Sequence, residues 1–176
     1  MKKTIITVLA ASLAVIALLA SCRKIDEGDP KTTDKATDKT PGTTAVEVVK
    51  DIDPAKAAKD IISKTGFSVT LDSIDEANVQ YIGGYDKIPA GTKCSVNMAA
   101  GANAEEVSVF KTDDTKTVAD AVRAHVEAQK TAFASYKPED MPKLDNAVIV
   151  EKSGVVVLVV TADYETAAKA VAEVIG

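Results

Sequence analysis

The stretch Val155-Val156-Val157-Leu158-Val159-Val160 decides the fold, because it is apolar at every position. Successive side chains of a strand point to opposite faces, so other parts of the chain must cover both faces of this one. An edge strand of this composition would promote aggregation, which places these residues inside a sheet. Lys152-Ser153-Gly154 predicts a tight turn, and residues 146–151 predict the strand before it.

Two more strands and a long helix are predicted upstream. The first strand has residues on one face at alternate positions, namely Cys94, Val96, Met98 and Ala100. A turn at residues 101–103 leads to a second strand at residues 107–110. Asp113 and Asp114 then precede a long helix that stops by Pro138. Its predicted inner face recurs every three or four residues, at Val118, Val122, Val126, Gln129, Phe133 and Tyr136.

The resulting order predicts an α+β domain, in which a helix precedes two strand–strand–helix units. The first helix begins at Asp53-Pro54, a capping residue followed by proline. The last is an alanine-rich helix after Thr161 or Asp163. We expect a mostly antiparallel sheet of four strands. Residues 67–72 alternate and predict a further short strand, whereas residues 75–91 favour no single structure.

The N-terminus has the features of a bacterial lipoprotein. Two lysines precede an apolar run, Ile5 to Ala20, which ends in Leu19-Ala20-Ser21-Cys22. As a helix this run would extend roughly 24 Å, short of the ~30 Å needed to span a bilayer. We therefore predict a signal peptide at residues 1–21, cleaved between Ser21 and Cys22, and lipid attached to Cys22. The alternative is an ordinary secreted protein with a chance cysteine.

Three segments follow from this interpretation: the signal peptide, a lipidated tether at residues 22–44, and one extracytoplasmic domain at residues 45–176. The tether is rich in Thr, Lys, Asp, Pro and Gly, and it cannot bury enough apolar surface to fold. Without the signal peptide the chain has 19 basic and 26 acidic residues. This acidic balance argues against binding to nucleic acid or to anionic lipid.

The domain resembles a family of uncharacterised lipoproteins of Gram-positive, clostridia-like bacteria, catalogued as a domain of unknown function. Three stretches carry the resemblance: residues 104–111, residues 129–139, and residues 144–148 followed by residues 154–158. These stretches are strand cores, turns and a helix end. The resemblance implies a membrane-anchored extracytoplasmic domain and carries over no catalytic residue.

No sequence motif predicts a reaction centre, a metal site or a cofactor. His125 is the only histidine, and a lone helical histidine more often packs or faces solvent than binds or catalyses. Cys94 is expected to be a small buried apolar residue, and a Cys94–His125 dyad is the minor alternative. The acidic pairs and triplet are expected to cap turns and helices. They are Asp72/Asp75/Glu76, Glu105/Glu106, Asp113/Asp114 and Glu139/Asp140.

We therefore expect a non-catalytic lipoprotein that binds a protein or another cell-envelope partner. The predicted contact surface is an exposed sheet edge or the loop with Tyr81 and Tyr85, and Tyr136 and Tyr164 are further candidates for a groove. The alternatives are a small-ligand binding lipoprotein and, less favoured, a small hydrolase or thiol enzyme based on Cys94 and His125. The predicted location is the outer face of the cell membrane, through the lipid.

Overall fold

The computed structural model describes residues 51–176, and the predicted signal peptide and tether lie outside them. The strands are β1 (Leu71–Ile74), β2 (Lys93–Ala99), β3 (Glu106–Lys111), β4 (Val148–Lys152) and β5 (Val155–Val160). The helices are α1 (Pro54–Lys64), α2 (Glu76–Val79), α3 (Thr115–Tyr136), α4 (Met141–Asp145) and α5 (Tyr164–Ile175). Two short 3-10 helices are η1 (Tyr85–Lys87) and η2 (Pro138–Asp140).

The five strands form one antiparallel sheet in the order β1-β2-β3-β5-β4. This confirms the α+β class and the interior position of β5, but the expectation of four strands is wrong. The short strand begins at Leu71, not at residue 67, and pairs with β2 as an edge. Residues 68 and 69 stay outside the ladder because their backbone N–H groups donate to the Glu105 carboxylate instead.

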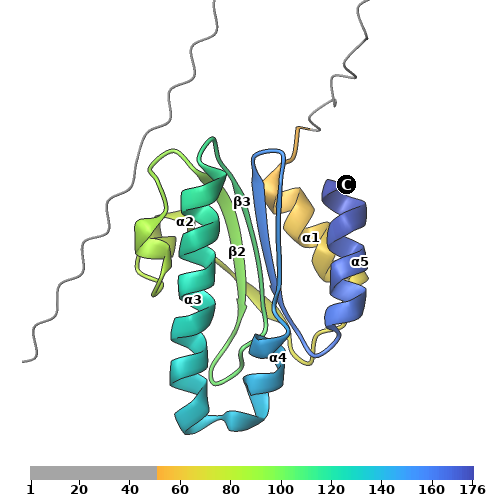
Figure 1. Cartoon of the computed structure of the whole chain (residues 1–176). Coiled ribbons are helices and arrows are strands. Elements are labelled where there is room, and N and C mark those ends of the chain that lie inside the picture. The colour runs from red at the N-terminus through yellow and green to blue at the C-terminus, as the bar shows by residue number, and fades with distance from the viewer. Residues whose placement is uncertain (1–50) are drawn as a thin grey trace, which may run out of the picture. The chain divides into compact units, whose positions relative to one another are not determined.

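The sheet lies between two helical layers (Figure 1). One face, which we call the α3 face, packs against α3, and the other, the α1/α5 face, packs against α1 and α5. In β5, Val156, Leu158 and Val160 belong to the α3 core, while Val155, Val157 and Val159 belong to the α1/α5 core. This explains why every position of β5 is apolar.

Local signals position these elements as predicted at several points. Asp53 caps α1 by accepting a hydrogen bond from the Lys56 N–H at 2.7 Å, with Pro54 in the first turn. The β4–β5 hairpin turns through Ser153 and Gly154, both with positive φ, at 48° and 78°. Two such residues in a two-residue loop match the twist of the flanking strands.

Candidate functional site

A cluster of polar side chains is buried between β3 and α3, in the layer that is otherwise the apolar core of the α3 face. It consists of Tyr85 from η1, Glu106 and Ser108 from β3, and His125 from α3. Each of these four residues is at most 2 % exposed. Burying polar groups is costly unless they are hydrogen-bonded, so their partners decide what the cluster does.

Glu106 is the hub of this cluster. Its Oε1 accepts hydrogen bonds from the Tyr85 hydroxyl at 2.6 Å and the Ser108 hydroxyl at 2.5 Å. Its Oε2 lies 2.8 Å from His125 Nε2. Burial alone would raise the pKa of Glu106, but the His125 charge and these three hydrogen bonds outweigh burial and bring the pKa below its ordinary value. The Glu106 carboxylate is therefore ionised.

His125 is held through both ring nitrogens. Its Nδ1 lies 2.7 Å from the carbonyl oxygen of Gly83, which can only accept, so Nδ1 carries a proton. Nε2 faces the ionised Glu106 and donates as well, which makes the ring an imidazolium. Burial lowers the pKa of His125, but the Glu106 charge and hydrogen bond and the Gly83 carbonyl raise it by more, so the net shift is upward.

The Tyr85 ring completes the enclosure. It stacks on the His125 ring at a centroid separation of 4.3 Å and meets the edge of Phe110 at 5.2 Å. Burial, followed by the charge of Glu106, raises the pKa of Tyr85 well above its ordinary value, so its hydroxyl stays protonated and donates. The aromatic layer excludes water from the ion pair.

The chain reaches this cluster by a close approach at Gly84. Its φ is +94°, and a Cβ built there would lie 2.5 Å from the backbone nitrogen of His125. Only glycine meets both conditions, because it has no side chain and tolerates positive φ. Gly84 thus lets the residues on either side of it in the chain contact His125, Gly83 through its carbonyl and Tyr85 through its ring.

This arrangement does not offer a base or nucleophile to a substrate. Both nitrogens of His125 are engaged, and the Cys94–His125 dyad is not formed. Cys94 is partly buried and packs against the apolar core of the α3 face. Burial, and then the charge of Glu76, raises the pKa of the Cys94 thiol, which disfavours the thiolate.

A second buried polar cluster joins the start of β3 to η2 and α4. Glu105 Oε2 accepts from the backbone and hydroxyl of Ser68, each at 2.8 Å. Lys143 lies 3.2 Å from Glu105 Oε1 and 3.3 Å from Asp140 Oδ1. Asp140 Oδ2 accepts from the backbone N–H of Ala104 at 3.0 Å. These contacts link chain segments that are distant in sequence. The two buried carboxylates, Glu105 and Asp140, thus have their partners within the domain.

The acidic residues therefore divide into two classes. Asp75 and Asp114 cap helices, as predicted, by accepting from the backbone N–H groups of Ala77 and Thr117. The expectation that Glu105 and Glu106 cap a turn or a helix is wrong for Glu106, which lies in β3, and both side chains are buried, each 1 % exposed. The signal missed was that β3 neighbours β5 and is itself interior, so a glutamate there needs a buried partner.

The tyrosines do not gather in one groove. Tyr81 is 79 % exposed, the largest value among the exposed large apolar residues of the described chain. Tyr85 is 1 % exposed, so of the two predicted contact residues only Tyr81 lies at the surface. Tyr136 ends α3 and Tyr164 begins α5, on opposite faces of the sheet, and both are exposed.

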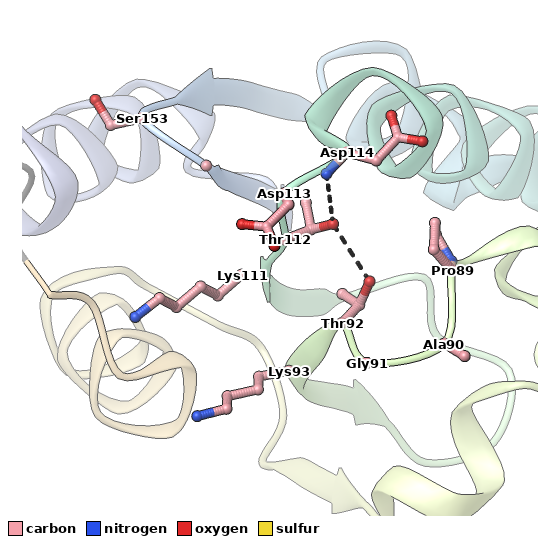
Figure 2. A pocket seen from close by; sticks show the side chains of 11 residues that line it. Pro89, Ala90, Gly91, Thr92, Lys93, Lys111, Thr112, Asp113, Asp114 and Ser153 are labelled. Carbon is pink, nitrogen blue, oxygen red and sulfur yellow. Dashed lines mark hydrogen bonds between the residues drawn. The ribbon is translucent and has the colours of Figure 1, made fainter.

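An open hollow of about 470 Å³ lies at the end of the sheet where β2 begins and β3 ends. In Figure 2, the Thr92 and Thr112 hydroxyls face one another, and Thr112 Oγ1 also accepts from the Asp114 N–H at 3.0 Å. The Lys93 and Lys111 side chains extend side by side away from these hydroxyls. Lys111 forms an ion pair with Asp51. The hollow thus has both charges at its rim and no buried reactive group.

Within residues 51–176, no three His, Cys, Asp or Glu side chains are grouped so as to hold a metal ion. None of the helices in this part of the chain combines the length and apolar character needed to cross a bilayer.

A domain of unknown function, DUF4358, is found at residues 91–161. This stretch runs from the start of β2 to the end of β5 and includes Glu106 and His125, whereas Gly83 and Tyr85 precede it. No curated protein matches the chain. No solved structure matches it either.

Proposed function

We propose that this protein is a lipid-anchored extracytoplasmic domain that binds a protein or another cell-envelope partner without catalysing a reaction. The anchor is inferred from the apolar N-terminal run and Leu19-Ala20-Ser21-Cys22. We also propose that the protein is related to lipoproteins of clostridia-like bacteria, and this part of the proposal is supported by the sequence resemblance.

The observation that carries the binding role is how the reactive side chains are used. The histidine and the carboxylate most suited to acid–base chemistry hold one another inside the core, with Tyr85 and Gly83 as further partners. What they stabilise is the loop at residues 80–88, which carries the exposed Tyr81. An exposed tyrosine on a rigid loop provides contact area at low entropic cost.

The anchor and the domain act together in this proposal. Lipid attachment confines the domain to the membrane surface, which raises its effective concentration near partners held there.

A site-specific crosslinking experiment tests the binding role. A photoreactive phenylalanine analogue replaces Tyr81, which is 79 % exposed, in one strain and Tyr164, which is 39 % exposed, in a control strain. We expect a discrete crosslinked partner from position 81, absent from position 164 and reduced in Cys22→Ala. Equal crosslinking from both positions, or crosslinking to no partner, would contradict the proposed surface. Mass spectrometry of the N-terminal peptide tests the anchor separately, because it must begin at a diacylglyceryl-modified Cys22.

The second candidate function, small-ligand binding, is favoured by the hollow at the end of the sheet. Its rim combines Lys93 and Lys111 with Asp113 and the hydroxyls of Thr92 and Thr112, a set that suits a small polar or zwitterionic molecule. A thermal-shift screen of amino acids and short peptides tests it. A hit must raise the melting temperature of the wild type and lose its effect in Lys93→Ala.

A further inference from the structure

The segment that follows Tyr81 is held to the core by two hydrogen bonds. We call residues 82–85 the strap. The Gly83 carbonyl accepts a hydrogen bond from His125 Nδ1, and the Tyr85 hydroxyl donates to Glu106. Between these two contacts, Gly84 packs directly against the backbone of His125. The strap is therefore fixed to α3 through His125 and to β3 through Glu106.

The hydrogen bond between His125 and the Gly83 carbonyl depends on a proton on Nδ1. An imidazolium donates from both nitrogens, whereas a neutral imidazole has one N–H only. Hydrogen bonds to an ionised acceptor are about twice as strong as neutral ones, so a single remaining proton stays on Nε2, facing Glu106. Nδ1 then presents a lone pair to the Gly83 carbonyl at 2.7 Å, where an attraction becomes a repulsion.

We propose that the His125 Nδ1 proton is a latch for the strap: it holds Gly83 while His125 is an imidazolium, and loss of that proton at alkaline pH releases the strap and the Tyr81 beside it. The latch closes again when the proton returns. It stands independently of the partner proposed above, because it concerns only contacts within the chain.

The groups around His125 define which titration moves the latch. Glu106 faces it from β3 and Tyr85 from η1, and Cys94 on β2 lies near Tyr85 with Glu76 of α2 near Cys94. Burial raises the pKa of both Tyr85 and Cys94, and the charge and hydrogen bonds of its partners lower the pKa of Glu106. The titration that moves the latch is that of His125, since the Nδ1 proton is the one that binds Gly83.

Hydrogen–deuterium exchange of the full chain in detergent tests the latch. Exchange at residues 80–88 is followed from pH 6 to pH 10, corrected for intrinsic base catalysis, with β5 as the internal reference. Loss of a hydrogen bond from a charged donor predicts a fall in protection of the strap of roughly 10-fold to 100-fold. Corrected protection that stays constant over this range, or that falls equally in β5, would overturn the proposal.

Two variants distinguish the pH-dependent release of the strap from a loss of its protection at every pH. Tyr85→Phe keeps the ring and His125 but removes the hydrogen bond to Glu106, so its strap should be less protected overall and retain the pH step. His125→Gln removes the titrating group, so its strap should show no step. A step that persists in His125→Gln would overturn the proposal. If His125→Gln fails to fold, Tyr85→Phe and the wild type still decide, because a flat profile in both contradicts the latch.

Discussion

Replacing Gly84 with alanine should destabilise the domain strongly, while the same change at Gly83 should not. The two glycines are neighbours in the strap, and neither is fully buried. They differ in the structure: a Cβ at Gly84 would lie 2.5 Å from His125 N and 2.6 Å from His125 Cα, whereas a Cβ at Gly83 would meet nothing within 4 Å. Gly84 also has φ of +94°, and Gly83 is not among the residues with positive φ.

The magnitude follows from two costs that add at Gly84. A left-handed backbone costs a non-glycine residue about 1–2 kcal/mol. Forcing an extra carbon against packed atoms costs about 1–3 kcal/mol, and here the obstacle is backbone that cannot rotate away. The free energy of unfolding should therefore fall by about 2–5 kcal/mol in Gly84→Ala. In Gly83→Ala it should change by less than about 1 kcal/mol, in either direction.

Equilibrium urea unfolding of both variants and the wild type measures this difference. With a slope of about 2 kcal/mol/M, the middle of the usual range for small domains in urea, the midpoint of Gly84→Ala should move down by about 1–2.5 M. Gly83→Ala should unfold near the wild-type midpoint. Coincident midpoints for the two variants would refute the close approach of the strap to α3, and with it the geometry of the His125 contact.

The remaining predictions concern pH, reactivity and the surface. The folded pKa of His125 lies above 6.5, so the stabilisation from the charged His125 is complete below pH 6.5 and is lost as the pH rises through the folded pKa. The folded pKa of Glu106 lies below 4.5, so the stabilisation from the ionised Glu106 is complete above pH 4.5 and is lost as the pH falls through the folded pKa. Stability by urea unfolding should thus be greatest between about 4.5 and 6.5, and a steady rise from pH 7 to pH 9 would contradict the ion pair. Cys94, with its raised pKa, should react with a thiol reagent more slowly at pH 8 in the folded protein than in urea, and equal rates would place it in open solvent. Asp53→Ala should cost about 1 kcal/mol through the lost cap of α1, whereas Tyr81→Ala should leave the melting temperature within error; a larger effect at Tyr81 would mean that its ring packs on the fold.

The sequence predicted those parts of the fold that depend on local pattern. The all-apolar composition of β5, the turn at Ser153-Gly154 and the Asp53-Pro54 cap each point to one structure, and each is observed. The start of β1 was not predictable in the same way. Its register depends on Glu105, 34 residues beyond the first paired residue, which binds the backbone at residues 68 and 69 and delays the strand.

The buried cluster was not foreseen for a related reason. Adjacent glutamates resemble a solvated turn, and a lone histidine on a helix gives no partner. Only the strand order shows that Glu106 points at α3 and meets His125, 19 residues later. Gly83-Gly84 did stand out in the sequence, but its role depends on which helix passes behind it.

The claim that links these results is that His125 is an imidazolium held between Glu106 and Gly83 inside the fold. Nitrogen-15 NMR of the His125 ring in the full chain tests it most directly, because a protonated ring nitrogen and an unprotonated one differ widely in chemical shift. We predict that at pH 6 to 7 both nitrogens show protonated shifts and that both protons exchange slowly with water. A neutral ring at pH 6, with one unprotonated nitrogen, would contradict the ion pair and the latch together.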